Sequence, residues 1–337
     1  MLTRVLIAAL IALIVSLLVG PRFIDFLRRN EFGQHIREDG PRHHIVKQGV
    51  PTMGGLLILF AATIAFLPVS NYRLQSLTVL FVTLACGAIG FLDDFVKLTH
   101  KRSLGLRGRW KLLLLAGVTV VVAIVARHLQ LSTDVYLPIA NVSVPLSWAW
   151  YPFLFLIIAG ASNGTNLADG LDGLAAGTGI IALFTFTAMM VVSFVRSSPN
   201  PAHRNLTKLD LAIIGAALIG GAVGFLWYNA FPAEVIMGDT GSMAFGGALA
   251  TFAIMTKTEV LLLLIGGIFV IEALSVIVQV ASFKYTGRRV FLMAPIHHHF
   301  EMKAWSETKI MVRFWIVAGI LCAAGFALFY RYYFNQA

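Results

Sequence analysis

The chain alternates between long apolar segments and short polar connections. Ten windows come close to the roughly 20 apolar residues that a helix needs to cross the hydrocarbon core of a bilayer. We therefore predict an all-α integral membrane protein with about ten transmembrane helices, folded as one domain over residues 1–337. The windows cover residues 2–20, 53–69, 75–92, 112–128, 148–162, 174–195, 209–230, 242–256, 259–283 and 309–332.

The composition agrees with this assignment. The chain is 58% hydrophobic and 12% charged, whereas soluble domains carry about 25% charged residues. Its net charge is +10, which in a soluble protein would suggest nucleic acid as a partner. Here the basic residues lie in loops between apolar windows, where they set the topology and attract anionic lipid or substrate. We therefore expect membrane lipid, and no nucleic acid, around this protein.

Two local features could be mistaken for something else. Residues 2–19 imitate a signal peptide, but Gly20 and Pro21 follow directly and no convincing small-residue cleavage site is present, so they read as a retained first span. Cys86 and Cys322 both lie inside apolar windows. They are better explained as packing residues than as a disulfide or a metal site.

The distribution of Lys and Arg predicts the orientation. We number each loop by the window that it follows. The odd-numbered loops carry about twice as many of these residues as the opposite side of the membrane, so these loops are predicted to be cytoplasmic and both termini periplasmic. The polar, glycine-rich stretches all fall in odd-numbered loops, and they can therefore converge on one cytoplasmic-face site. On the outer side, weak alternation about Ala140 and Asn141 predicts a short β-hairpin between the fourth and fifth windows.

Two adjacent carboxylates, Asp93 and Asp94, follow directly on the third window. Ionisable groups at such a place are costly unless a metal, a partner or water satisfies them, so they indicate a functional site. Paired carboxylates suit Mg²⁺, which usually binds one or two carboxylates together with substrate phosphates. The bases that follow, including Lys97 and Lys111, would suit those phosphates. The alternative is that these bases only anchor a helix at the membrane surface.

The loop between the fifth and sixth windows concentrates amide and acidic side chains among glycines: Asn163, Asn166, Asp169 and Asp172. Asp169 and Asp172 are three residues apart, so a helical turn would place both on one face. The loop has no Lys or Arg, so its acids would bind hydrogen-bond donors such as a base, a ribose or an amide, or support a metal site. The spacing of an EF-hand is absent. Helix capping explains one of these residues better than all four.

Two acids lie close to the later windows. Asp239 lies between glycines at the start of the eighth window and is the first candidate to complete a metal site with Asp93 and Asp94. Glu272 lies inside the ninth window, where a polar group of the bundle interior is a better explanation than a catalytic residue.

Three consecutive histidines, His297, His298 and His299, lie between the ninth and tenth windows. Consecutive side chains cannot all face one way, and the spacing of HExxH zinc sites is missing. In a cytoplasmic loop beside carboxylates and bases, these histidines would contact phosphate or move protons. A zinc site is the alternative.

Five of these motifs occur together in an order and spacing that resemble the polyprenyl-phosphate N-acetylhexosamine-1-phosphate transferases. The histidine run followed by Phe-Glu resembles the phospho-N-acetylmuramoyl-pentapeptide transferase (translocase I) branch rather than the N-acetylglucosamine branch. The resemblance covers nearly the whole chain; each motif is weak alone, and the ordered set is specific. The motifs are Pro51-Thr-Met-Gly-Gly55, Asp93-Asp-Phe-Val-Lys97, Asn166-Leu-Ala-Asp-Gly-Leu-Asp-Gly173, Met237-Gly-Asp-Thr-Gly-Ser242 and Pro295-Ile-His-His-His-Phe-Glu301.

The resemblance implies the first membrane step of peptidoglycan synthesis. UDP-N-acetylmuramoyl-pentapeptide (UDP-MurNAc-pentapeptide) and undecaprenyl phosphate would give undecaprenyl-pyrophosphoryl-muramoyl-pentapeptide (lipid I) and UMP, with Mg²⁺ as cofactor. It also implies a multi-pass protein of the bacterial inner (cytoplasmic) membrane, a homodimer, and a lipid groove beside a bent ninth span. The nucleoside-substrate pocket would be one that nucleoside antibiotics also occupy.

The resemblance also assigns roles to residues. Asp93 and Asp94 match the catalytic acidic pair, Asp239 matches the Mg²⁺-binding acid, and His297 matches the essential first histidine; all three acids are expected at the metal. Ile236 is a departure, because many members have Phe there, and an aromatic ring can stack on the uracil. Lys47, Thr52, Asn166, Asp169 and His298 match positions that line the nucleoside-substrate pocket. From the chemistry of the motifs we also expect Lys97, Lys111, Asn163, Asp172, Ser242 and His299 to bind substrate.

Phosphoryl transfer needs charge neutralisation and positioning more than covalent work from the protein. We therefore expect direct attack by the lipid phosphate, with Asp93 assisting its deprotonation; a covalent Asp93-phosphosugar intermediate is the alternative. Other activities to weigh are the same chemistry on UDP-N-acetylglucosamine, secondary transport and non-catalytic lipid binding. Transporters place their polar sites near the midplane, whereas these motifs cluster at one face. A scaffold would leave the acids and histidines unexplained.

Overall fold

A computed structural model of the chain describes residues 1–30, 49–100 and 105–335, and it is almost entirely helical. Each of the ten predicted windows falls on helix. The α-helices are α1 (Thr3–Arg29), α2 (Gly55–Phe66), α3 (Leu74–Thr99), α4 (Gly108–His128), α5 (Trp150–Ala168), α6 (Leu174–Arg196), α7 (Leu206–Asn229), α8 (Gly238–Met255), α9 (Leu262–Ile265), α10 (Gly267–Thr286), α11 (Ile296–Glu301) and α12 (Glu307–Asn335). Two short 3₁₀ helices cover Ser147–Ala149 and Pro201–His203.

The helices confirm a multi-pass membrane protein. Within the described residues, seven of them are long and apolar enough to cross a bilayer: α1, α3, α4, α6, α7, α10 and α12. The helices α2, α5 and α8 lie on the shorter predicted windows. A helix satisfies its own backbone N–H and C=O groups, so it is the form that such apolar segments take in hydrocarbon.

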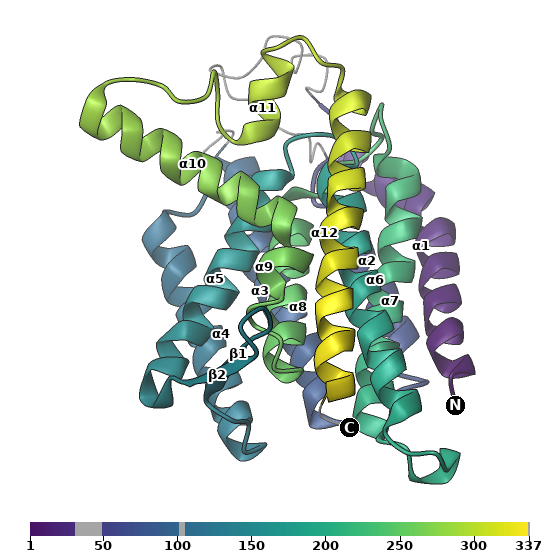
Figure 1. Cartoon of the computed structure of the whole chain (residues 1–337). Coiled ribbons are helices and arrows are strands. Elements are labelled where there is room, and N and C mark those ends of the chain that lie inside the picture. The colour runs from purple at the N-terminus through teal and green to yellow at the C-terminus, as the bar shows by residue number, and fades with distance from the viewer. Residues whose placement is uncertain (31–48, 101–104, 336–337) are drawn as a thin grey trace.

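Both termini lie at the same end of the bundle, and α11 lies at the opposite end (Figure 1). The predicted hairpin is present as β1 (Asp134–Leu137) and β2 (Val142–Pro145), paired antiparallel with Val135 opposite Val144. It belongs to the end that carries the termini, because the Tyr136 ring packs on Tyr332 near the end of α12, with centroids 3.9 Å apart. Cys86 and Cys322 are free and buried, as a packing role predicts.

Helix α8 is the centre of one half of the bundle. Each of its residues from Asp239 to Met255 is buried, against α3, α5 and α2. Glycines allow these backbones to approach closely. A Cβ on Gly90 of α3 would lie 2.1 Å from the carbonyl oxygen of Asp239, and one on Gly55 of α2 would lie 2.2 Å from the Gly241 Cα. Small residues at helix interfaces are how membrane helices gain packing without a hydrophobic driving force. The start of α8 is thereby held against the end of α3.

The predicted ninth span is two helices rather than one. The four-residue α9 ends at Ile265, and after Gly266 the helix α10 continues in a different direction, leaning away from α12 (Figure 1). Much of α10 is exposed, with Leu274, Ile277 and Val280 each more than half accessible. The bend that the resemblance implied is therefore present at a glycine pair, where helices commonly kink.

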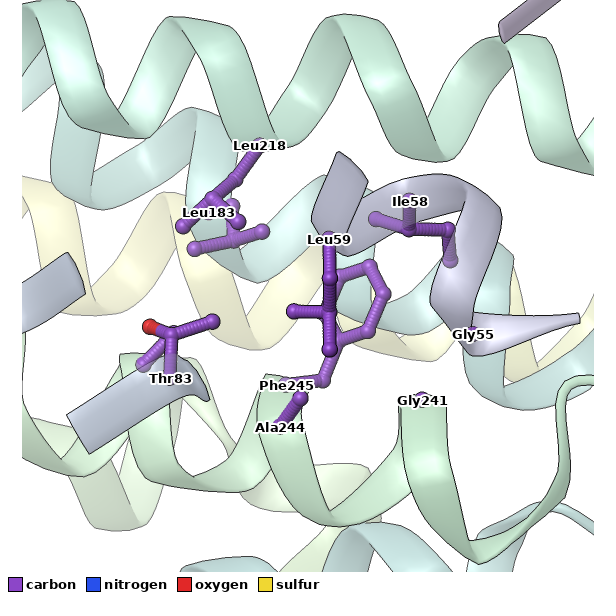
Figure 2. A pocket seen from close by; sticks show the side chains of 10 residues that line it. Gly55, Ile58, Leu59, Thr83, Leu183, Leu218, Gly241, Ala244 and Phe245 are labelled. Carbon is purple, nitrogen blue, oxygen red and sulfur yellow. The ribbon is translucent and has the colours of Figure 1, made fainter. Parts of the chain in front are cut away.

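A small apolar cavity lies between α2, α3, α6, α7 and α8, next to the contact of Gly55 with Gly241 (Figure 2). Its lining is apolar except for Thr83, whose hydroxyl donates to the Val79 carbonyl of its own helix. Apolar cavities of this kind stay dry, because water needs two or more polar partners. The cavity is therefore a packing defect beside the site and not a binding pocket.

A buried carboxylate ties the α2–α3 connection to α7. Asp210 has no exposed surface, and it accepts hydrogen bonds from the Ser70 hydroxyl at 3.0 Å and from the backbone N–H groups of Asn71 and Arg73 at 2.6 and 3.0 Å. The Ser76 hydroxyl is a fourth donor. These bonds fix the start of α3 at the end of the bundle away from α11.

We expect Asp210→Ala to destabilise the protein strongly. Four donors would lose their acceptor, and among them the Ser76 hydroxyl is buried; a buried unsatisfied donor costs about 1–3 kcal/mol. The apparent melting temperature in detergent should fall clearly below that of wild type, whereas Asp134→Ala, on the exposed side of β1, should leave it nearly unchanged. Equal melting temperatures for the two variants would contradict the anchoring role of Asp210.

Candidate active site

Six helix ends meet at the end of the bundle that lies opposite the termini. They are the C-terminal ends of α3 and α5 and the N-terminal ends of α2, α4, α6 and α8, with α11 beside them. These ends carry the motifs that were predicted to converge. The helices are long and closely packed, so side chains on their last turns are held at defined distances from one another.

Three carboxylates are brought together there. Asp93 and Asp94 lie in the last turns of α3, Asp239 lies in the first turn of α8, and all three are buried. One oxygen of each lies within 4.8 Å of the other two. Burying three like charges is costly unless opposite charges and hydrogen bonds compensate them.

Two lysines supply most of that compensation. The Lys97 ammonium lies 2.7 Å from an oxygen of Asp93 and 2.7 Å from an oxygen of Asp239. The Lys111 ammonium, at the start of α4, lies 3.0 Å from Asp93 and 2.7 Å from Asp239. Three carboxylates and two ammonium groups leave one net negative charge. The cluster therefore still attracts a cation, while its lysines remain next to any phosphate that the cation brings.

Asp94 holds the start of α8. Its carboxylate accepts from the backbone N–H groups of Asp239 and Thr240, at 3.2 and 3.0 Å, and from the Thr240 hydroxyl at 2.8 Å. The preceding Gly238 has a positive φ of 72°, and a Cβ there would lie 2.6 Å from the Asp94 carboxylate and 2.8 Å from the Thr52 hydroxyl. A negative charge at the N-terminal end of a helix is stabilised by its free N–H groups. Asp94 therefore positions Asp239.

Asp93 is enclosed by the turn that precedes α4. The Leu106 N–H donates to one of its oxygens at 2.7 Å, and a Cβ on Gly105 would lie 2.3 Å from the same carboxylate. The other oxygen, Oδ2, is buried and has the Lys97 ammonium as its ion-pair partner, but it accepts no hydrogen bond from the described residues. Asp93 thus offers an oxygen atom to a ligand that Asp94, with its capping bonds, does not.

Asn166 and Ser242 orient the remaining acid. The Asn166 amide donates to Asp239 at 3.1 Å, and the Ser242 hydroxyl donates to the Asn166 carbonyl oxygen at 3.1 Å and to the Gly238 carbonyl at 2.9 Å. These bonds join the end of α5 to the start of α8. They explain why an amide and a hydroxyl accompany the acids in the motifs.

The loop that contains Thr52 is joined to the segment before α8 by backbone hydrogen bonds. The Ile236 N–H donates to the Pro51 carbonyl at 2.7 Å, and the Gly54 N–H donates to the Ile236 carbonyl at 2.9 Å. Thr52 is buried beside Gly238. The predicted site residue Lys47, on the same loop, lies outside the described residues.

Asp169 follows the last turn of α5 and is half-buried. Burial and the nearby carboxylates of Asp239 and Asp94 raise the pKa of Asp169 well above its usual value, against a backbone hydrogen bond from Gly238. A carboxyl group with a raised pKa can keep its proton and donate a hydrogen bond. Asp169 is therefore suited to a substrate oxygen as well as to an N–H group.

The other amide and acid of this loop have structural partners. The Asn163 amide donates to the Ala159 carbonyl at 2.8 Å, and Asp172 accepts from the Ala233 N–H at 3.1 Å. Asn229, at the end of α7, accepts from the Gly173 N–H at 3.0 Å and donates to the Val235 carbonyl at 2.9 Å. Asp172 and Asn229 thus tie the loop after α5 to the segment before α8.

The three histidines face different ways, as predicted for consecutive side chains. His297 is fully buried and its Nδ1 lies 3.0 Å from Glu272 of α10. His298 pairs with Glu301 through its own Nδ1. The Leu292 N–H donates to the Nδ1 of His299 at 3.1 Å, and burial together with the Lys303 ammonium lowers the pKa of His299.

The geometry also bears on the alternative of a zinc site at the histidines. His297, His298 and Glu301 each place one ligand atom within 4.8 Å of the others. However, one nitrogen of His297 is engaged with Glu272, and His298 and Glu301 are engaged with each other. The acidic cluster, whose oxygens come from three positions on two helices, is the better divalent-cation site.

Comparisons with known proteins decide the family. The sequence profile of glycosyl transferase family 4 matches residues 76–257. The phospho-N-acetylmuramoyl-pentapeptide-transferase of Halalkalibacterium halodurans is 46% identical over 96% of this chain and 97% of its own length. The proteins of the same name from Frankia alni and Bacillus subtilis are 45% and 44% identical, over 98% and 95% of this chain and the same shares of their own lengths. The chain belongs to the phospho-N-acetylmuramoyl-pentapeptide-transferase family.

In this transferase, sequence reasoning missed one residue that supports the site, Asn229, and interpreted a second, Glu272, only as a polar group of the bundle interior. Asn229 falls at the end of an apolar window, and Glu272 falls inside one. One signal could have found both residues. A polar side chain within an apolar window needs a hydrogen-bond partner, and the polar motif loops are the parts of the chain that can supply one. Which partner each has depends on how the helices pack.

We expect Gly90→Ala to reduce transferase activity by about 10²-fold or more, because the new Cβ would force the start of α8 away from α3, and a shift of about 1 Å at a reacting group can cost this much. Gly117→Ala, on α4, is the matched control, since a Cβ there meets nothing within 4 Å. Activity per folded protein should be measured for both. An active Gly90→Ala variant would show that the contact between the two backbones does not set the site.

Proposed function

We propose that the buried cluster of three acids and two lysines is the transfer centre of this enzyme. The chain is a phospho-N-acetylmuramoyl-pentapeptide transferase of the bacterial cytoplasmic membrane, and it forms lipid I in peptidoglycan synthesis. The donor is UDP-MurNAc-pentapeptide, the acceptor is undecaprenyl phosphate, and UMP is released. The observation that carries the site assignment is the convergence of Asp93, Asp94 and Asp239 with Lys97 and Lys111 at one end of the bundle.

The cluster fits Mg²⁺ by its chemistry. Mg²⁺ prefers carboxylate oxygens and usually retains waters and substrate phosphates as further ligands. Asp239 would hold it, with the Asp93 and Asp94 carboxylates beside it in the acidic cluster. Asp94 would support the site through its bonds to the start of α8. When bound, Mg²⁺ would neutralise the donor pyrophosphate and stabilise the leaving UMP.

The lysines provide the second part of the charge stabilisation. Lys97 and Lys111 each bridge two carboxylates, so both ammonium groups are held at the acidic cluster, where phosphate oxygens would arrive. Preorganised donors of this kind stabilise charge that develops during transfer without having to reorganise. They would contact the non-bridging oxygens of the transferred phosphate.

The acceptor phosphate would be activated by Asp93. Its Oδ1 is engaged by the Leu106 N–H and the Lys111 ammonium, and Oδ2, which is paired with the Lys97 ammonium but accepts no hydrogen bond from the described residues, would take the proton of the lipid phosphate. A direct attack on the donor pyrophosphate then follows, with no covalent bond to the protein. The lipid would approach along the exposed apolar face of α10.

The donor would lie between the loops that surround the cluster. Thr52, Asn166, Asp169 and Ser242 would line this region and bind the nucleoside, the ribose and the sugar. His297, whose ring lies against Gly170 of the same loop, would act at the transfer centre. Ile236 is held through its backbone by the loop before α2, and as an aliphatic residue it would not stack on the uracil as an aromatic ring can. Asn163, Asp172, His298 and His299 would act mainly by shaping the loops, and Lys47 stays a prediction.

Two features of the assembly complete the proposal. The end that carries the cluster would face the cytoplasm, as the distribution of Lys and Arg predicts, because the sugar nucleotide is a cytoplasmic compound. The enzyme would be a homodimer in the membrane, and nucleoside antibiotics would compete with the donor for its pocket.

We expect Asp239→Asn to lower UMP release by several orders of magnitude, because the site would lose a metal-binding carboxylate while the lysines keep their charge. UMP release should be measured for purified wild type and variant across a titration of Mg²⁺, with thermal unfolding as the check on folding. Asp134→Asn, on the exposed hairpin, is the control. Near-normal turnover by the Asp239 variant would remove this residue from the metal site.

A further inference from the structure

We infer that Glu272 is a positioning residue for the transfer reaction. Its carboxylate accepts the Nδ1–H of His297, which fixes the imidazole in one tautomer and leaves Nε2 as the atom that faces the loop after α5. This inference rests on the proposed role of His297 at the transfer centre, and it adds an acid from inside a membrane helix to the residues on which that role depends.

The geometry of the pair is specific. Glu272 lies in the second turn of α10, just after the bend at Gly266, and His297 lies in the first turn of α11. Neither side chain has exposed surface, and Nδ1 lies 3.0 Å from Oε1. On the other side of the ring, a Cβ on Gly170 would lie 2.4 Å from Nε2. The imidazole thus bridges from α10 to the motif loop that contains Asp169.

Hydrogen-bond chemistry determines which nitrogen carries the proton. An ionised carboxylate only accepts hydrogen bonds, so we assign Nδ1 of His297 as the donor to Glu272. In the neutral ring the other nitrogen then carries the lone pair. Nε2 of His297 is buried and has no hydrogen-bond partner among the described residues. It is therefore available to accept a proton or a hydrogen bond from a substrate hydroxyl in the donor pocket.

The energetics argue against a purely structural acid. A buried carboxylate in hydrocarbon is costly, and Oε2 of Glu272 also accepts no hydrogen bond from the described residues. A neutral amide such as Gln could hold α11 on α10 with less loss of solvation. The extra contribution of a charge is that it forces the direction of the hydrogen bond, which an amide, being both donor and acceptor, does not.

The test compares Glu272→Gln with a matched change elsewhere. Glu259→Gln is the control, because Glu259 is also buried, with one oxygen bonded to Lys257 at 2.6 Å and the other without a hydrogen-bond partner among the described residues. It follows the far end of α8, roughly 25 Å from the start of that helix at 1.5 Å per residue. Lipid I formation should be measured for the purified full-length enzymes at saturating and limiting donor, with thermal unfolding alongside.

We expect Glu272→Gln to lower kcat by about 10²-fold or more with little change in the donor KM, as reversed tautomers do in other enzymes that rely on an acid and histidine pair. Glu259→Gln should keep near-wild-type kcat. His297→Ala should also lose kcat, and adding Glu272→Gln to it should cost nothing further, because the acid acts only through the ring.

The outcomes separate the two claims. Near-normal turnover by His297→Ala would overturn the proposed role of His297. An inactive His297→Ala variant beside a fully active Glu272→Gln variant, or additive losses in the double variant, would overturn the positioning role of Glu272. If Glu272→Gln does not fold, nitrogen-15 NMR of histidine-labelled wild type, assigned with His297→Ala, decides the question. A proton on Nδ1 supports the inference, and a neutral ring with its proton on Nε2 contradicts it.

Discussion

The site depends on the compensation of buried charge where α3 meets α8. Three carboxylates can share this place only because Lys97 and Lys111 lie between them and because the free N–H groups at the start of α8 point at Asp94. Lys97 is three and four residues after the two acids of α3, so one helix face supplies both charges. The remaining partners come from α4 and α8. The ends of these helices are therefore held in place by the same interactions to which we attribute the chemistry.

The small residues at the helix interfaces allow the first turns of α8 to lie directly against α2 and α3, which fixes the relative positions of the side chains at the site. Gly90 and Gly55 bring the backbones of α3 and α2 into direct contact with the first turns of α8. A rigid centre of this kind contrasts with α10, which leaves the bundle after Gly266 and exposes an apolar face. A packed centre beside an exposed apolar helix suits an enzyme whose polar donor needs fixed groups, while its lipid acceptor must enter from the bilayer.

The two ends of the bundle show what separates a structural acid from a functional one. Asp210 is surrounded by neutral donors, with hydrogen bonds to both of its oxygens. Asp93 and Asp239 share cations instead, and Asp93 retains an oxygen that accepts no hydrogen bond from the described residues. Glu272 and His297 also each have a buried side-chain atom without a hydrogen-bond partner among the described residues. Burial alone therefore does not mark a site.

The sequence by itself determined the membrane class, the positions of the helices, the hairpin and the grouping of motifs at one face, because hydropathy and charge act along the chain over distances of one span. It also named the acids and lysines of the cluster. The tertiary structure decided the rest: that Asp94 caps α8, that the ninth span bends at Gly266, and that Glu272 meets His297. The two contacts join residues from different helices: Glu272 and His297 are 25 positions apart, and Asp94 and Thr240 are 146 positions apart. The packing of the helices determines both contacts. No local pattern records that packing, since many arrangements of the same apolar helices would satisfy the same hydropathy.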